Sequence, residues 1–84
     1  MKTIYYSKQA AKILKGLPRN TAQKIVSKIN EYAVDPQSQA NNVIQMSGSP
    51  YYRLRVGDWR IIFDDEGNIL TILKIASRGE IYKN

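Results

Sequence analysis

The side chains best suited to chemistry in this 84-residue sequence are arginines, and most of them are gathered in one stretch. Four of the five arginines are Arg53, Arg55, Arg60 and Arg78, whereas six of the eight lysines lie within the first 28 residues. A guanidinium group binds two phosphate oxygens at once through parallel hydrogen bonds. Arginines that are grouped on strands therefore indicate a site for an anion, and a phosphodiester chain is the simplest polyanion that would fit.

Two predicted strands, residues 52–56 and 59–64, position three of these arginines. Both segments are rich in β-branched, aromatic and alternating apolar residues, and Gly57-Asp58 between them fits a two-residue hairpin turn. Because successive side chains of a strand point to opposite faces, the arginines of the hairpin are expected on one face and its apolar residues on the other.

The expected register sets two positive charges directly against each other. Arg55 faces Arg60 across the hairpin, and Arg53 lies one diagonal step away on the same face. Like charges in this position destabilise a sheet, and no acidic residue occurs in 52–56 or 59–63 to neutralise them. A bound polyanion would offset the repulsion. The alternative interpretation is an exposed face on which the arginine stems cover apolar neighbours.

The opposite face of the same hairpin is predicted to form the hydrophobic core. It carries Leu54 and Val56 from one strand and Trp59, Ile61 and Phe63 from the other. The alternation of Trp59 with Ile61 and Phe63 favours a core position for its ring; stacking of that ring on a nucleobase is the alternative.

A third strand is predicted at 69–77, where nearly every residue is apolar. A central strand covered on both faces has this composition. Its register depends on the turn after Asp64-Asp65. A three-residue loop would place Lys74 and Arg78 on the arginine face, whereas a four-residue loop would place them on the core face. The sequence leaves both registers open.

The first half of the chain predicts one strand and two helices. Residues 3–6 are β-prone, Ser7 suits a helix N-cap, and helical spacing of apolar residues continues to the break at Leu17-Pro18. A second helix is expected from there to Asp35-Pro36, followed by a loop over 35–50 with a short turn near 43–46. The predicted fold is α+β in the order β-α-α-β-β-β: a twisted, mainly antiparallel four-stranded sheet with a helical hairpin on one face.

Composition narrows the possible functions further. We expect one domain over residues 1–84, because the chain is long enough for one core only. There is no histidine or cysteine, so the usual zinc ligands and thiolate chemistry are missing, and we expect no metal and no cofactor. No apolar run is long enough for a membrane span and no secretory signal is evident, which favours the cytoplasm. The net charge of +6 favours nucleic acid or an acidic protein as partner.

The hairpin segment from Ser49 to Phe63 (SPYYRLRVGDWRIIF) resembles the central hairpin of RelE/ParE-type toxins of type II toxin–antitoxin systems, and the tail from Ser77 to Tyr82 (SRGEIY) resembles their terminal motif. The resemblance covers nearly the whole chain. Resemblance to the RelE branch implies a metal-independent mRNA endoribonuclease that acts in the ribosomal decoding site. It also implies a cognate antitoxin protein as partner, together with mRNA and the ribosome.

The resemblance also assigns roles to individual residues. It implies that catalysis is carried by Arg53, Arg55, Arg60, Arg78 and Tyr82, and that RNA binding is carried by Arg53, Arg55, Arg60, Lys74 and Arg78. Tyr82 is the expected base, with Glu80 as the alternative; Ser77 stands where many relatives carry histidine. Two other functions stay open: inhibition of DNA gyrase, as in the ParE branch, and RNA binding without chemistry.

Overall fold

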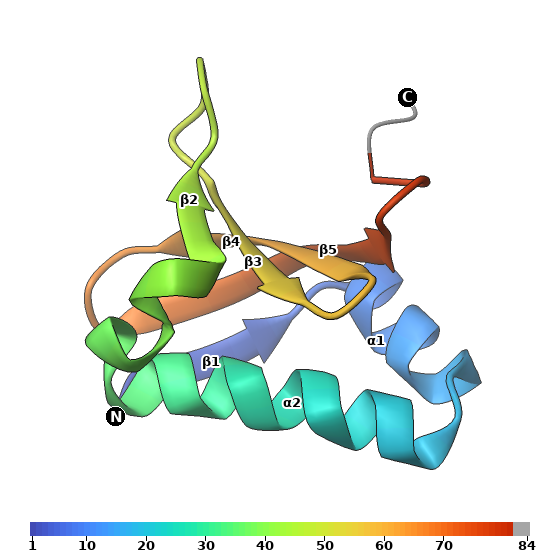
Figure 1. Cartoon of the computed structure of the whole chain (residues 1–84). Coiled ribbons are helices and arrows are strands. Elements are labelled where there is room, and N and C mark those ends of the chain that lie inside the picture. The colour runs from blue at the N-terminus through green and yellow to red at the C-terminus, as the bar shows by residue number, and fades with distance from the viewer. Residues whose placement is uncertain (82–84) are drawn as a thin grey trace.

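The computed structural model describes residues 1–81 and arranges them as one twisted sheet with helices against one of its faces (Figure 1). The elements in chain order are β1 (Thr3–Tyr6), α1 (Lys8–Gly16), α2 (Arg19–Val34), the 3₁₀ helix η1 (Pro36–Asn42), β2 (Val43–Gln45), β3 (Tyr52–Val56), β4 (Trp59–Asp65) and β5 (Ile69–Ser77). Within these residues, none of the helices has the length and hydrophobicity that crossing a lipid bilayer requires.

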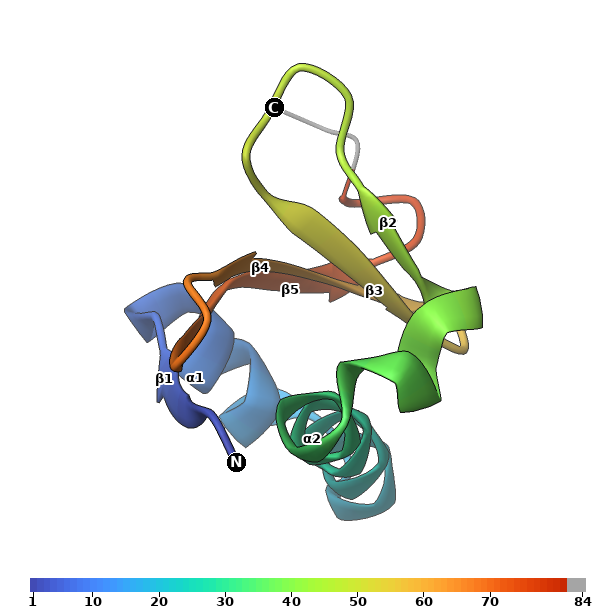
Figure 2. The same ribbon diagram turned by 90° about the vertical axis from the view of Figure 1, so that its left-hand side faces the viewer.

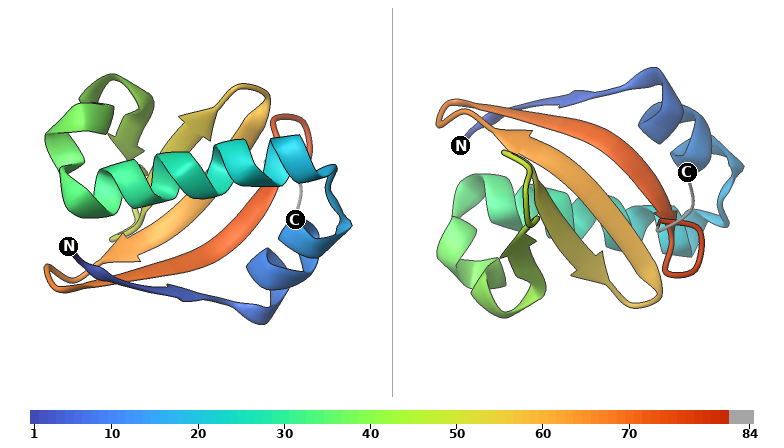
Figure 3. Two further views of the ribbon diagram at one scale, coloured as in Figure 1. Left: turned by 90° about the horizontal axis from the view of Figure 1, so that it is seen from below. Right: turned by 90° about the horizontal axis from the view of Figure 1, so that it is seen from above.

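The sheet has the strand order β1-β5-β4-β3-β2, with β1 parallel to β5 and every other neighbour antiparallel. The helices α1 and α2 lie on one side, and the connection between β2 and β3 rises on the other (Figure 2). Seen from below, α2 runs across the strands and α1 lies beside the end of β5 (Figure 3). The predicted α+β fold is confirmed.

The sheet contains five strands rather than the predicted four. The extra strand, β2, pairs Val43 with Leu54 and Gln45 with Tyr52, and η1 precedes it. The prediction of a loop over 35–50 was therefore wrong in this part. These two elements are hard to recognise in the sequence because the segment is polar and neither element has a hydrophobic period. The helix η1 is a short 3₁₀ helix, and β2 is only three residues long.

The predicted helix boundaries are confirmed and have local causes. Ser7 caps α1, since its Oγ accepts a hydrogen bond from the Ala10 N–H at 3.1 Å. Pro18 stands at the start of α2, where a missing N–H is tolerated. Asp35 ends α2 in an extended conformation before Pro36.

A single cluster of buried residues joins the helices to the sheet. The side chains of Ile25 and Ile29 from α2 pack with those of Leu54, Ile61 and Phe63 from the hairpin. Trp59 is partly buried and packs against this cluster, as its alternation with Ile61 predicted. The core accordingly occupies the helix side of the sheet, and the arginines of β3 and β4 lie on the other side together with Ile62.

The edge of β5 is completed by a side chain where β1 stops. β1 pairs with β5 only as far as Tyr6 and Ile72. Beyond that point the amide of Gln9 takes the place of a strand: its Nε2 donates to the Ile75 carbonyl at 3.1 Å, and its Oε1 accepts from the Ile75 N–H at 3.0 Å. This pairing satisfies backbone groups that an exposed strand edge would otherwise leave open.

A polar contact at the opposite end of the sheet fastens the β4–β5 hairpin to α2 and the N-terminus. Tyr32 donates its hydroxyl proton to Asp65 Oδ2 at 2.6 Å, and the Lys2 ammonium lies 3.1 Å from Asp65 Oδ1. Burial alone would raise the pKa of Asp65, but hydrogen bonds from Tyr32, Lys2 and the Gly67 N–H outweigh it and hold that pKa below its ordinary value. Burial, followed by the bond to Asp65, raises the pKa of Tyr32.

The stability of the fold should therefore depend on the ionisation of Asp65. Since its folded-state pKa is lowered, the stabilisation is complete above the ordinary carboxyl range and is lost as pH falls through the folded-state pKa. We expect Asp65→Asn to lower the free energy of unfolding by about 1–3 kcal/mol at neutral pH and to flatten its decline in acid, as measured by urea denaturation at several pH values. Asp64→Asn is the matched control; an equal loss in both variants would contradict this role of Asp65.

Candidate nucleic-acid interface

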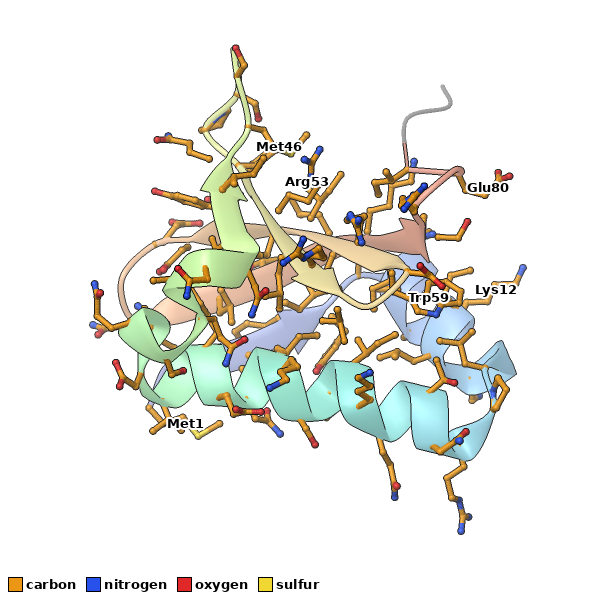
Figure 4. The ribbon with its side chains drawn as sticks, in the orientation of Figure 1. Met1, Lys12, Met46, Arg53, Trp59 and Glu80 are labelled. Carbon is orange, nitrogen blue, oxygen red and sulfur yellow. The ribbon has the colours of Figure 1, made fainter. Side chains whose placement is uncertain are left out.

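The β3–β4 hairpin has the register that the sequence predicts. Val56 pairs with Trp59, and Arg55 lies directly opposite Arg60. Gly57, the first of the two turn residues, has a positive φ of +58°, and within residues 1–81 only glycines have a positive φ. A positive φ at Gly57 followed by a negative φ at Asp58 corresponds to a type II′ turn. Alternation then sends Arg53, Arg55 and Arg60 away from the core; Figure 4 shows Arg53 above the sheet, on the side opposite α2.

These arginines converge on one hollow, which we call the arginine hollow. It has a volume of about 200 Å³ and is lined by Arg53, Arg55 and Arg60 together with Asn41, Asn42 and Ile44. Three guanidinium-bearing side chains thus border one space that is open to solvent. A concave surface bordered by several cations concentrates positive potential, so this arrangement suits an anion.

Hydrogen bonds tie two of the guanidinium groups to different neutral acceptors. Arg55 Nη2 donates to Asn42 Oδ1 at 3.3 Å, whereas Arg60 Nη1 donates to the carbonyls of Gly57 at 2.8 Å and Trp59 at 3.0 Å. These neutral acceptors orient the side chains without cancelling their charge. Since a guanidinium group carries five N–H donors, each retains donors that can bind an incoming oxygen.

No carboxylate neutralises either member of the opposed pair within the described part of the chain. The ion pairs there join Lys2 to Asp65 and Lys28 to Glu31, away from Arg55 and Arg60. Nor do residues 1–81 contain a group of three or more acidic side chains placed to hold a metal ion. The positive charge of the opposed pair Arg55 and Arg60 is therefore left for a ligand to balance.

A β-bulge decides the face of Lys74. In the β4–β5 hairpin, Asp65 lies opposite Leu70, so the loop between them has four residues. Without a bulge, this register would place Lys74 on the core face. The register shifts by one residue between Ile62 and Phe63, so Lys74 lies opposite Ile62 and on the arginine face. Lys74 does not line the arginine hollow; it borders a separate hollow of about 420 Å³ beside α1, together with Trp59 and Glu80.

The predicted residues of the C-terminal motif lie outside the arginine hollow or outside the described residues. Arg78 is exposed directly after β5, and its backbone N–H donates to the Asp58 carbonyl at 2.7 Å, which ties the end of β5 to the β3–β4 turn. Glu80 is exposed, and Ile81 is buried. Tyr82, the expected base, lies outside residues 1–81, so the structure does not place it.

The residues that form one wall of the arginine hollow were not predicted from the sequence. Asn41, Asn42 and Ile44 come from η1 and β2, the segment that was predicted as a loop. The Val43-Ile44 pair was the available signal, because two β-branched residues in a polar stretch favour a short strand.

Solved structures of RelE toxins share this fold. The chain is similar to the RelE–RelB complex of the archaeon Pyrococcus horikoshii OT3, with 26% identity over 93% of this chain and 96% of that chain and a TM-score of 0.76. It is similar to the RelB–RelE complex of Methanococcus jannaschii, with 24% identity, 94% and 95% coverage and a TM-score of 0.74. It is also similar to the intact RelBE complex of E. coli, with 20% identity over 92% of this chain and 96% of that chain and a TM-score of 0.72.

The fold and the basic hairpin thus define a RelE-like toxin. The sequence model of the ParE toxin of the type II toxin–antitoxin system parDE matches residues 4–82. The chain therefore belongs to this toxin family, within the RelE/ParE superfamily. A search of curated proteins found no match.

Because Arg55 and Arg60 repel each other across the hairpin, removing one charge should stabilise the fold. We expect Arg55→Gln, which keeps an N–H donor for Asn42, to raise the free energy of unfolding by about 0.2–1 kcal/mol at low salt, and the gain to shrink as salt screens the pair. Urea denaturation at two salt concentrations measures this effect. Arg19→Gln, at the start of α2, is the control; a loss of stability in Arg55→Gln at both salt concentrations would contradict the repulsion.

Proposed function

We propose that this toxin is a metal-independent endoribonuclease that cuts mRNA on the ribosome. The observation that carries the proposal is the convergence of Arg53, Arg55 and Arg60 on one hollow. Arg55 and Arg60 lie directly opposite each other there, and no carboxylate within residues 1–81 forms an ion pair with either. Phosphoryl chemistry on RNA needs the phosphate held and its developing charge stabilised, and preorganised cations supply both.

The RNA itself provides the nucleophile in this mechanism. Its 2′-hydroxyl oxygen attacks the adjacent phosphorus, and the bond from phosphorus to the 5′-oxygen of the next nucleotide breaks, which leaves a cyclic phosphate and a 5′-hydroxyl group. One proton must leave the 2′-oxygen and one must reach the 5′-oxygen. Arg60 and Arg78 would hold the phosphate oxygens, Arg53 and Arg55 would stabilise the extra negative charge of the pentavalent state, and Lys74 would bind the RNA backbone beside them.

Proton transfer would fall to the C-terminal motif. Tyr82 is the proposed base, because guanidinium groups brought close to a phenol would favour its phenolate form, and Glu80 is the alternative. A well-placed proton acceptor typically supplies a rate factor of ~10²–10⁴, and one electrostatic donor ~10²–10³. Arginine is a poor base because its guanidinium group does not lose its proton in proteins. This division of roles requires no metal.

The proposed partners follow from the same surface. We propose that residues 1–84 act as one toxin domain in the cytoplasm, on ribosome-bound mRNA, and that a cognate antitoxin protein silences it. Three similar structures are complexes of RelE with RelB. A net charge of +6 favours an acidic or amphipathic antitoxin segment laid against the sheet or the helical hairpin.

The nuclease proposal predicts large losses from single substitutions. We expect Arg60→Ala and Tyr82→Phe each to slow cleavage of ribosome-bound mRNA by about 10²-fold or more, with Arg19→Ala, away from the arginine hollow, unchanged. Primer extension on transcripts from a purified translation system gives the rates. Unchanged cutting in both Arg60→Ala and Tyr82→Phe would exclude this assignment.

Inhibition of DNA gyrase is the second candidate, and the match to the ParE family model favours it. Under this function the chain would block supercoiling of a relaxed plasmid and leave mRNA intact. Supercoiling and RNA-cleavage assays on the same preparation separate the two functions: RNA cleavage without loss of supercoiling supports the nuclease, and the reverse result supports the gyrase inhibitor.

A further inference from the structure

Gln39 is a buried polar side chain just behind the arginine hollow. It belongs to η1, is only 3% exposed, and is the one buried polar or charged residue among residues 1–81. Burying an amide is unfavourable unless its hydrogen-bonding groups find partners. Gln39 Nε2 donates to Glu31 Oε1 and to Ser38 Oγ, both at 3.5 Å, and Gln39 Oε1 accepts from Asn42 Nδ2 at 3.4 Å.

This bond fixes which way the Asn42 amide faces. An asparagine amide donates through nitrogen and accepts through oxygen, so the contact of Nδ2 with Gln39 turns Oδ1 toward the arginine hollow. There Oδ1 accepts from Arg55 Nη2 at 3.3 Å. A continuous chain of hydrogen bonds thus runs from Glu31 on α2 through the two amides to Arg55 on β3.

Arg55 needs such a contact because it is exposed and repelled. It lies opposite Arg60, which is held by the carbonyls of Gly57 and Trp59. A long, exposed arginine side chain otherwise samples many rotamers, and ordering it on binding weakens affinity. An acceptor anchored to a buried group reduces that loss.

We propose that Asn42 is a positioning residue of the RNA site: held by buried Gln39, it keeps the Arg55 guanidinium in the arginine hollow, ready for a phosphate of single-stranded RNA. This inference rests on the proposed function and extends the site to η1. Asn42 contributes no charge. Its effect must therefore pass through Arg55, and the number of phosphates neutralised must stay the same without it.

A double-mutant cycle on RNA affinity tests this role. The probe is a short 2′-O-methyl oligoribonucleotide, which cannot be cut, and fluorescence anisotropy at several salt concentrations gives its dissociation constant. We expect Asn42→Ala to weaken binding by about 3- to 10-fold in the wild-type background and by less than about twofold beside Arg55→Ala. Arg55→Ala should lower the salt slope by about 0.7, and Asn42→Ala should leave it unchanged.

Controls separate positioning from general damage. Gln37→Ala removes an exposed amide of the same helix η1 that does not line the arginine hollow, and it should leave the affinity unchanged. Melting temperatures check folding, and if Asn42→Ala is unfolded then Asn42→Ser, whose shorter side chain cannot reach both partners, replaces it with the same expectation.

Three results would overturn the inference. An equal loss from Asn42→Ala in both backgrounds, or an equal loss from Gln37→Ala, would remove the positioning role alone and leave the RNA site standing. An unchanged affinity of Arg55→Ala would remove the proposed RNA site itself, and this inference with it.

Discussion

The properties of the exposed sheet face depend on one electrostatic constraint: Arg55 and Arg60 lie directly opposite each other across the β3–β4 hairpin, and no carboxylate within residues 1–81 forms an ion pair with either. The hairpin tolerates this because its other face carries Leu54, Ile61 and Phe63, all nearly fully buried. Hydrophobic burial fixes the register, and the register fixes the opposed charges. The stability of the core thus allows the opposite face to carry an unfavourable pair that a polyanion would relieve.

Several local devices shape that face. The carbonyls of the turn hold Arg60, and the Asn42 amide holds Arg55. The bulge at Ile62 and Phe63 turns Lys74 outward. Because these features are neutral hydrogen-bond acceptors or backbone geometry, they orient Arg55, Arg60 and Lys74 without neutralising their positive charge. Cations that are already oriented before the substrate binds can hold a phosphate and stabilise the negative charge that develops during phosphoryl transfer.

The sequence predicted the hairpin well because two independent signals agree there. The alternation of apolar side chains defined both strands, and Gly57-Asp58 left one favourable register, so the opposition of Arg55 and Arg60 followed from the chain alone. The family resemblance rested on the same segment, and the match of the toxin family to residues 4–82 confirms it.

Other features could not be predicted from local pattern. The face of Lys74 depends on a bulge, and a one-residue shift has no composition signal of its own. The wall formed by Asn42 and Ile44 depends on η1 and β2, which are held by contacts with α2 and β3 rather than by their own propensity. Gln39 reads as a surface residue in sequence and becomes buried only through the way η1 packs against α2.

The most direct test of the account is a titration followed by NMR of the arginine Nε–Hε signals, with an uncleavable 2′-O-methyl oligoribonucleotide as ligand. We expect the signals of Arg53, Arg55 and Arg60 to move together and to saturate at one equivalent, while that of Arg19 on α2 stays in place. Movement of Arg19 to the same extent, or of only one of the three hairpin arginines, would contradict a shared phosphate site.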